Sequence, residues 1–358
     1  MRPLPNSVDI LLTEAIKLGA SDIHLATGAV PKCRIYGSLS AISDYPVLTD
    51  RDTRRLLEPL LDAYARRELD SLGQFDLSYS IHDVGRFRVN IFKQKGAWSG
   101  VFRSLSSNVP AFESLGLPLA LYDVTSLRRG LVLVTGITGS GKSTTLASLV
   151  DIINKTYNKH IITLEEPIEY LHWHERCIVS QREVGKDVSS FDLGLRAALR
   201  EDPDVILVGE MRDQETMETA LQAAETGHLV LSTLHTIGAV ETVDRIINTF
   251  PESRHAQLRS QLASTLSCVV SQQLMPKAST KGYALACELM FTDKTIKQHI
   301  VEGTTYKLSD YLRENKATDM GMISMDNSIK KLYSKKLISR ATAVSYALDK
   351  RKMEKELV

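Results

Sequence analysis

Cysteine is scarce in this sequence, and its few copies are scattered along the chain. Only four of the 358 residues are cysteine, and no two of them form a C-x-x-C pair. This spacing indicates neither a disulfide framework nor a zinc site built from four thiolates. Reduced thiols in a cytoplasmic protein are therefore the simplest interpretation of Cys33, Cys177, Cys268 and Cys287.

The sequence also lacks an excess of charge of either sign. Lysine and arginine total 44, aspartate and glutamate total 43, and the formal net charge is +1. Nucleic-acid-binding proteins normally carry a basic excess, so this balance argues against that class and we expect no nucleic-acid partner. The hydrophobic fraction of 43% and the charged fraction of 24% are those of an ordinary soluble protein.

Long hydrophobic runs are missing as well. No run approaches the roughly 18 apolar residues that a membrane-spanning helix needs. The N-terminal stretch MRPLPNSVDILLTEAIKLG carries acidic residues within its apolar part, which predicts an amphipathic helix over residues 8–18 rather than a secretion signal. We therefore expect a cytoplasmic protein, which could still act on a membrane partner.

The first third of the chain has the pattern of a small α+β domain. Strand patterns alternate with one predicted helix at about residues 50–70, and no phosphate-binding loop occurs there. The stretch SNVPAFESLGLP, residues 107–118, is rich in proline, serine and glycine, which is typical of a linker. We expect a domain over residues 1–108 and a linker over 109–126.

The remainder of the chain has a different pattern. From Leu131 onward, the short apolar runs LVLVT, IITLEE, DVILVGE and HLVLSTLH are separated by helical stretches. Such alternation predicts an α/β domain, here over residues 127–290, with a mostly parallel sheet covered by helices on both faces. Residues 291–358 have a lysine-rich helical pattern, which fits either a solvated helical face or a surface that docks a partner.

One motif between these runs predicts a phosphate-binding loop. Residues 136–143 read GITGSGKS, which fits G-x-x-x-x-G-K-S, and they directly follow the strand LVLVT and open a predicted helix. Gly139 and Gly141 let successive N–H groups turn toward phosphate oxygens, and the helix N-terminus adds its positive dipole end. Lys142 can reach the β and γ phosphates, and the Ser143 hydroxyl can bind Mg²⁺. The motif therefore predicts a nucleoside triphosphate site.

Acidic residues follow two of the predicted strands. Glu165 and Glu166 come after IITL, and Glu210 comes after VILVG. Ligands of a doubly wound sheet lie at the carboxyl ends of its strands, so these carboxylates are expected near the phosphates. A carboxylate in that place can hold a magnesium-bound water or orient the water that attacks. The other interpretation is that they are plain surface charges.

Two histidines flank the strand LVLSTL. His235 leaves its carboxyl end, where the γ phosphate would be sensed, whereas His228 precedes the strand and could equally be a capping residue. A further cluster, HWHERC, contains His172, His174 and Cys177. It offers no fourth ligand in its surroundings, so we do not expect zinc there.

The first domain contains a predicted β-hairpin, GRFRVNIFKQKGAWSGVFRSL, over residues 85–105. A turn at Lys95-Gly96 places Arg88 opposite Arg103. Like charges directly across two strands are unfavourable, so an anionic group is expected beside them. That group is either an acidic side chain of the same domain or a triphosphate bound elsewhere, which the two residues would contact as arginine fingers.

Together these motifs resemble the secretion-type ATPases of the RecA-like superfamily, most closely the type IV pilus retraction ATPases of twitching motility. The resemblance rests on GASDIHL, GRFRVN, VTGITGSGKSTTLASLVD, ITLEEPIEY, QREVG, ALREDPDVILVGEMRD, AAETGHLVLSTLHT and DRIINTFP, and it covers nearly the whole chain. It implies an N-terminal PAS-like domain, a RecA-like P-loop NTPase core and a helical C-terminal segment. It also implies a homo-hexamer that hydrolyses ATP with Mg²⁺.

The resemblance assigns roles to individual residues. Glu165 and Glu166 match an Asp-rich box, and Glu210 matches an atypical Walker B glutamate that also serves the metal with Ser143. His228 and His235 match a histidine box, and Arg88 and Arg103 match arginine fingers. The nucleotide-binding Walker A loop falls on Gly136, Thr138, Gly139, Ser140, Gly141, Lys142, Ser143 and Thr144.

The chain departs from the family pattern at two places. The box usually reads Glu-Asp-Pro, and here it reads Glu165-Glu166-Pro167. A segment that usually reads Ala-Ile-Arg-Asn-Leu-Ile in retraction ATPases reads TIKQHI here, at residues 295–300. Because that segment is tied to retraction in the family, this departure bears on the direction of the motor.

The resemblance leaves three functions in competition. The first is a motor that retracts pili by acting on an inner-membrane platform protein, from the cytoplasmic face of that membrane. The second is a pilus-assembly or type II secretion ATPase, a class that is longer at the N-terminus and usually carries a four-cysteine insert; this sequence has neither. The third is a low-turnover regulatory ring, against which the intact set of Lys142, Ser143 and Glu210 argues.

Overall fold

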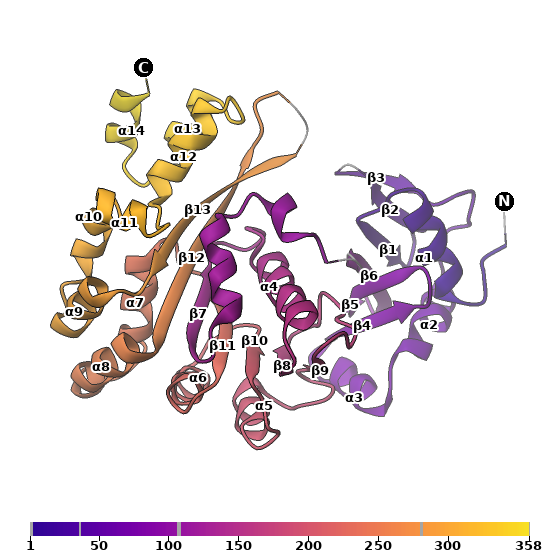
Figure 1. The fold of residues 1–358 in the computed structure, drawn as a ribbon. Helices are drawn as coiled ribbons and strands as arrows, with labels where there is room; N and C mark the ends of the chain where they lie inside the picture. The colour runs from indigo at the N-terminus through magenta and orange to yellow at the C-terminus, as the bar shows by residue number, and fades with distance from the viewer. Residues whose placement is uncertain (1–2, 36, 106–108, 280–281, 358) are drawn as a thin grey trace. The chain divides into compact units, whose positions relative to one another are not determined.

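The computed structural model describes residues 3–35, 37–105, 109–279 and 282–357 (Figure 1). The chain divides into two compact units, residues 1–108 with 167–171, and residues 109–166 with 172–358. Ser107 and Asn108, the first residues of the predicted linker stretch, lie outside the described residues.

The first unit contains a six-stranded antiparallel sheet in the order β3-β2-β1-β6-β5-β4. Apolar side chains of its helices and strands, among them Leu11, Ile23, Leu57 and Phe87, form one buried core. The elements are α1 (Val8–Lys17), β1 (Asp22–Ala26), β2 (Lys32–Ile35), β3 (Ser38–Ala41), α2 (Asp50–Leu57), the 3₁₀ helix η1 (Glu58–Leu60), α3 (Ala63–Leu72), β4 (Gln74–Ile81), β5 (Gly85–Gln94) and β6 (Ala97–Leu105).

The predicted N-terminal helix is confirmed by α1, but the single helix expected at residues 50–70 is wrong. Two helices, α2 and α3, occupy that stretch, with η1 between them. Pro59 lacks a backbone N–H and stops the regular α-helical pattern. Asp62 then starts the second helix, because its side chain accepts a hydrogen bond from Ala65 N at 2.7 Å.

The second unit is built on a seven-stranded sheet in the order β13-β12-β7-β11-β10-β8-β9. All its strand pairs are parallel except β12 with β13. The four apolar runs are strands, so the predicted parallel sheet is confirmed, and β13 adds an antiparallel edge. The strands are β7 (Gly130–Thr135), β8 (His160–Glu165), β9 (Ile178–Glu183), β10 (Val205–Val208), β11 (Leu229–Leu234), β12 (Leu266–Pro276) and β13 (Tyr283–Phe291).

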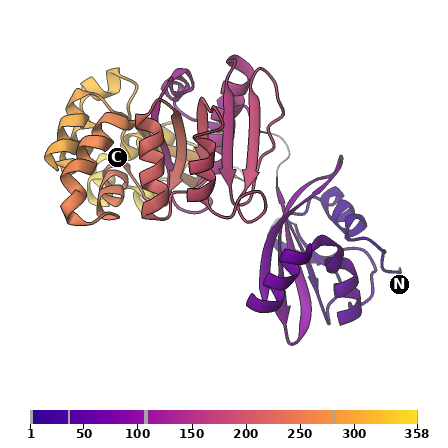
Figure 2. The same cartoon turned by 90° about the horizontal axis from the view of Figure 1, so that it is seen from below.

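Helices cover both faces of this sheet (Figure 1 and Figure 2). Alternate side chains of β7 point to opposite faces: Leu131 packs in one core and Val132 in the other. On one face lie α5 (Phe191–Ala198), α6 (Gln214–Glu225), α7 (Ala239–Asn248) and α8 (His255–Thr265). On the other lie α4 (Lys142–Thr156) and the 3₁₀ helices η2 (Phe112–Leu115) and η3 (Leu119–Ser126).

The C-terminal part is helical, as its sequence pattern predicts. Its apolar stripe is buried, since Met325, Ile329 and Ala343 pack against Met275 of β12 and Ala286 of β13. None of the helices in the described part of the chain has both the length and the apolar character needed to cross a bilayer. The helices are α9 (Lys294–Glu302), η5 (Thr305–Lys307), α10 (Leu308–Tyr311), α11 (Asn315–Asp319), α12 (Met325–Ser334), α13 (Arg340–Tyr346) and α14 (Lys350–Glu356), preceded by η4 (Glu252–Arg254).

Candidate nucleotide site

The loop between β7 and α4 has the backbone that its sequence predicts. Gly139 and Gly141 have φ angles of +80° and +91°, a left-handed conformation that glycine adopts without strain. Gly141 is the N-cap of α4, and the helix begins at Lys142. The N–H groups in the first turn of α4 have no partner within the helix. A glycine-rich loop followed by such a helix N-terminus is the arrangement that binds phosphate.

The loop lies close to β12 at its start. A Cβ at Gly136 would lie 2.6 Å from Ser140 Oγ and closer still to the carbonyl oxygen of Gln272, so only glycine fits. The Lys142 side chain is buried, and its Nζ donates to the carbonyl oxygens of Gly136 at 2.8 Å and Ile137 at 3.2 Å. The ammonium group of Lys142 therefore lies inside the phosphate-binding loop.

The donor set of the loop fits a phosphate group. Ser140 Oγ is buried and has no hydrogen-bond partner among the described residues, and Ser143 is exposed at the start of α4. Buried hydroxyls are normally hydrogen-bonded, so Ser140 offers a free donor to a ligand. These hydroxyls, the N–H groups of the loop and Lys142 are what a magnesium-bound nucleotide requires.

Glu210 lies beyond the end of β10 and has two basic neighbours. Its Oε2 lies 2.9 Å from Arg212 Nε, and its Oε1 lies 3.2 Å from His235 Nε2. Arg212 also donates through Nη1 to Glu166 Oε2 at 3.0 Å. Burial opposes the charge of Arg212, but hydrogen bonds and attraction from the two carboxylates outweigh it and raise its pKa. Glu210, Arg212, Glu166 and His235 thus form one network.

Two side chains of β11 donate hydrogen bonds to the main chain at the end of β10. Ser232 Oγ donates to the carbonyl oxygen of Val208 at 2.7 Å, and Thr233 Oγ1 donates to that of Gly209 at 2.6 Å. The N–H of Gly136 donates to the carbonyl oxygen of Leu234 at 3.3 Å. The phosphate loop, His235 and Glu210 therefore lie next to one another at the carboxyl edge of the sheet.

The predicted Glu165-Glu166 box splits between two sets of partners. Glu165, the last residue of β8, accepts hydrogen bonds from Thr163 Oγ1 at 2.7 Å and from Gln181 Nε2 at 3.1 Å. Glu166 instead forms the ion pair with Arg212. Glu166 therefore belongs to the same network as Glu210, whereas Glu165 is held by residues of β8 and β9.

His228 lies at the opposite end of β11 from His235. The strand has six residues, which corresponds to a length of about 20 Å. The Nδ1 of His228 lies 3.0 Å from the carbonyl oxygen of Ala223, near the end of α6. Within one chain, His228 therefore contacts the last turn of a helix, as the capping interpretation has it, and its family role stays a prediction.

The predicted arginine pair is confirmed in its register: Arg88 lies directly opposite Arg103 on β5 and β6. Each has an acidic neighbour within the first unit. Arg103 Nε lies 2.9 Å from Asp22 Oδ1, and Arg88 Nε lies 3.9 Å from Asp76 Oδ1. The side chain of Arg103 is still 69% exposed, and that of Arg88 is 47% exposed. A role as arginine fingers stays a prediction.

The HWHERC cluster is held by hydrogen bonds to the main chain. His174 Nδ1 accepts from Val179 N at 3.1 Å, and Cys177 Sγ donates to the carbonyl oxygen of Tyr157 at 3.0 Å. Over the described ranges, no group of three or more His, Cys, Asp or Glu side chains is arranged to hold a metal ion.

Comparison with known proteins identifies the family. The family model described as "Type II/IV secretion system protein" matches residues 86–354. The type IV pilus retractation ATPase PilT of Pseudomonas aeruginosa is 43% identical over 333 residues, covering 93% of this chain and 96% of that protein. The chain belongs to the family of type II/IV secretion system proteins.

Two further matches place the chain within this secretion family. A twitching motility protein of Neisseria gonorrhoeae is 38% identical, covering 94% of this chain and 89% of that protein. A crystal structure of the pilus retraction motor PilT with bound ADP is 46% identical, with a TM-score of 0.90 and coverage of 96% and 98%. The chain is thus a PilT-like pilus retraction ATPase, and the predicted RecA-like fold class and family are confirmed.

The segment that departs from the retraction motif of this secretion family lies on α9 (Lys294–Glu302). Ile296 and Ile300, which the chain keeps, are fully buried in the core of the second unit. Lys297 and Gln298 are exposed. The packing positions are therefore retained, and the departures include exposed positions of the helix.

Sequence reasoning missed residues that the structure adds to the site. Arg212 stands in the quoted motif VILVGEMRD, but no local pattern indicates that it pairs with Glu166, which lies 46 positions earlier in the chain. A cavity of about 380 Å³ beside Glu210 and His235 also has Arg212, Glu241 and Arg245 in its wall. These residues become neighbours only because β8, β10 and β11 lie side by side.

Proposed function

We propose that this ATPase hydrolyses magnesium-bound ATP at the loop of residues 136–144, with Glu210 as the residue that aligns the attacking water. The observation that carries the proposal is the position of Glu210 and His235 beside that loop, at the carboxyl edge of neighbouring parallel strands. Ligands bind at this edge in doubly wound sheets.

The chain's own residues divide the work. The N–H groups of the loop and Lys142 bind the phosphates, and Ser143 and Glu210 are the residues that would hold Mg²⁺. The metal supplies charge neutralisation at the phosphates when it is bound. Arg212 and His235 fix the orientation of the Glu210 carboxylate from its two oxygens, so that it can hold a water in line with the γ phosphate.

We further propose that the chain works as a homo-hexamer in the cytoplasm, at the inner face of the cell membrane. There it would pull on a platform protein of the pilus. Arg88 and Arg103 would contact ATP bound to a neighbouring subunit, where their charge stabilises the transition state. Their exposure within the first unit supports this role.

The decisive enzymatic experiment replaces Glu210 by glutamine, which keeps the shape and removes the charge. We expect the ATPase rate of Glu210→Gln to fall by about 100-fold or more, with ATP binding retained because the loop is intact. The matched control is Glu252→Gln, at an exposed residue of η4, which should keep the wild-type rate. A rate for Glu210→Gln within twofold of wild type would refute the assignment.

The direction of the motor is tested in cells that lack the gene. Retraction predicts that such cells keep their surface pili, or carry more of them, and no longer twitch. Bald cells would instead indicate a pilus-assembly ATPase. Wild-type pili and motility combined with negligible ATP turnover of the purified ring would indicate a regulatory ring.

A further inference from the structure

The turn that follows His235 is held by side chains from distant strands. Residues 236–238 connect β11 to α7, and Gly238 is the N-cap of α7 without a side-chain cap of its own. Gly238 N donates to Ser271 Oγ at 2.8 Å, and Ala239 N donates to Glu288 Oε1 at 2.7 Å. Two successive N–H groups, the last of the turn and the first of α7, are thus bound by β12 and β13.

Ser271 and Glu288 are cross-strand neighbours in the sheet. They lie directly opposite each other in the register of β12 and β13. Their exposed fractions are 0% and 6%, and Gly238 has a φ of +97°, which favours glycine. A Cβ at Gly238 would lie 3.5 Å from Glu288 Oε1. The turn is therefore in close contact with the carboxylate.

The Glu288 carboxylate also reaches a second helix. Its Oε2 accepts a hydrogen bond from Met325 N, the first residue of α12, at 3.2 Å. Helix N-termini favour negative charge, so one carboxylate here serves both α7 and α12. Burial raises the pKa of Glu288, and the N–H groups of Ala239 and Met325 oppose that rise. Asp326 and Arg313 are the charged residues that also act on it.

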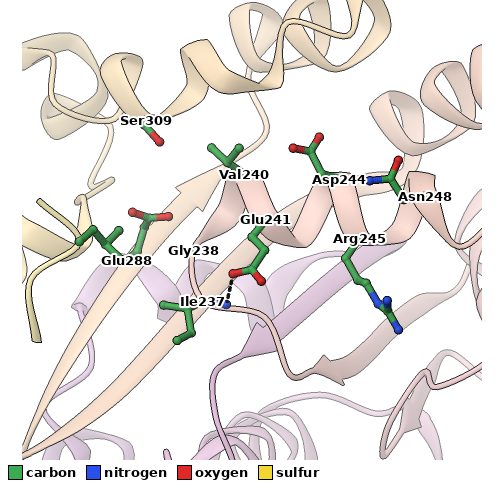
Figure 3. A pocket seen from close by; sticks show the side chains of 10 residues that line it. Ile237, Gly238, Val240, Glu241, Asp244, Arg245, Asn248, Glu288 and Ser309 are labelled. Atoms are coloured by element: carbon green, nitrogen blue, oxygen red, sulfur yellow. Dashed lines mark hydrogen bonds between the residues drawn. The ribbon is translucent and has the colours of Figure 1, made fainter.

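Figure 3 shows Glu288 beside Gly238 on the wall of a cavity of about 460 Å³. On the other side of the turn, Ile237 N donates to Glu241 Oε2 at 3.0 Å, the bond drawn as a dashed line. Glu241 is a local partner from the first turn of α7. Ser271 and Glu288, by contrast, connect the turn to strands β12 and β13. Of these, β12 lies directly beside β7, the strand that leads into the phosphate loop.

We propose that Ser271 and Glu288 are positioning residues that hold the turn of residues 236–238, and through it hold His235 against Glu210. The inference rests on the proposed role of His235 and Glu210 in hydrolysis. His235 begins the segment at the end of β11, and its Nε2 lies 3.2 Å from Glu210 Oε1. Because Glu288 also binds α12, the position of this turn depends on the C-terminal helices.

The test uses the full-length ring and the variants Ser271→Ala and Glu288→Gln. Ser271→Ala removes the acceptor of Gly238 N, and Glu288→Gln leaves one amide oxygen that cannot accept from both Ala239 N and Met325 N. We expect kcat to fall about 10- to 100-fold, as small misplacements of catalytic groups do. The KM for ATP should change less than twofold, since the phosphate loop is untouched. Ser267→Ala, on the same strand with a hydroxyl 3.5 Å from the carbonyl oxygen of Thr265, is the matched control and should keep wild-type kcat.

A double-mutant cycle separates positioning from general stability. If Ser271 acts through His235, adding Ser271→Ala to His235→Ala lowers kcat no further. If the serine variant lowers kcat by its full factor in that background as well, the positioning role is overturned. If His235→Ala alone keeps wild-type kcat, the role of His235 in the proposed function fails first, and the inference falls with it.

Hydrogen exchange gives a second readout that does not depend on turnover. Exchange should speed up over residues 236–243 in Ser271→Ala. In Glu288→Gln it should speed up over those residues or over the first turn of α12, because one amide oxygen cannot accept from both N–H groups. Unchanged exchange over residues 236–243 in both variants would overturn the inference, even if the rate of hydrolysis falls.

Discussion

Arg212 Nε lies 2.9 Å from Glu210 Oε2, and the Nη1 of the same guanidinium lies 3.0 Å from Glu166 Oε2. Arginine can make these two contacts at once because its donors form a rigid planar fork. Glu166 stands where the family usually has aspartate, and its longer side chain reaches Arg212. The contact with Arg212 is thus the structural consequence of glutamate in place of aspartate at residue 166.

The first prediction concerns this guanidinium. Arg212→Lys keeps the charge but supplies a single ammonium, which cannot contact both carboxylates in the same geometry. We expect kcat for ATP hydrolysis to fall about tenfold, a loss typical of a removed orienting contact, with KM little changed. Steady-state ATPase assays measure this. Arg196→Lys, at the surface pair with Asp192, should be silent, and a silent Arg212→Lys would contradict the network's role.

The second prediction concerns the arginine pair and needs mixed rings. Arg88→Ala and Arg103→Ala subunits should each hydrolyse ATP poorly in homogeneous rings, with a loss of about 10³-fold or more. When Arg88→Ala subunits are mixed with Glu210→Gln subunits, part of the activity should return, because intact sites form between unlike neighbours. Full activity of either arginine variant in an assembled ring would exclude arginine fingers.

The third prediction concerns magnesium. Removing Mg²⁺ with a chelator should abolish hydrolysis, and adding it back should restore it, since Mg²⁺ neutralises charge on the phosphates. Ser143→Ala should raise the Mg²⁺ concentration needed for half-maximal rate. Ser264→Ala, whose exposed hydroxyl donates to a carbonyl oxygen of α8, should leave that concentration unchanged. Hydrolysis that persists in excess chelator would refute the metal requirement.

The fourth prediction concerns the start of the phosphate loop. Gly136→Ala should abolish nucleotide binding, because the added Cβ collides with the carbonyl oxygen of Gln272 and with Ser140 Oγ. Its φ of +140° adds backbone strain. Titration with a fluorescent ADP analogue measures the affinity. Gly37→Ala, at another positive-φ glycine with open space around its Cβ, serves as the control and should bind normally.

The fifth prediction concerns stability against pH. Burial opposes the charge of Asp22, but the hydrogen bond and the charge of Arg103 outweigh it and hold the pKa below its ordinary value. A carboxyl with a lowered folded pKa adds stability above its unfolded pKa, about 3.9, and loses it as pH falls through the folded value. Asp22→Asn should therefore lower stability by about 1 kcal/mol at pH 7.

The same difference should shrink as pH falls below about 3.9 and vanish only below the lower folded pKa, where wild-type Asp22 is protonated in the folded state as well. Urea unfolding of both proteins at pH 7 and near pH 3 measures the difference. Asp83→Asn, at a largely exposed residue of the same unit, controls for loss of surface charge. A difference between Asp22→Asn and wild type that persists unchanged at the lower pH would contradict the prediction.

The sequence alone determined the features that depend on local backbone geometry. Gly139 and Gly141 allow the backbone turn of the phosphate loop, because glycine adopts positive φ angles without strain. The turn at Lys95-Gly96 set the register that places Arg88 opposite Arg103, since every pair in a hairpin follows from its turn. The break at Pro59 and Asp62 was local too, and its signals were present in the sequence.

Only the tertiary structure decided which distant side chains meet. Arg212 reaches Glu166, and Ser271 and Glu288 reach the turn at Gly238, because of the order β13-β12-β7-β11-β10-β8 in the sheet. The apolar residues Phe112 and Leu121 of the expected linker stretch pack into the core of the second unit. Strand order and core packing arise from contacts between remote segments, and no periodicity within one segment carries that information.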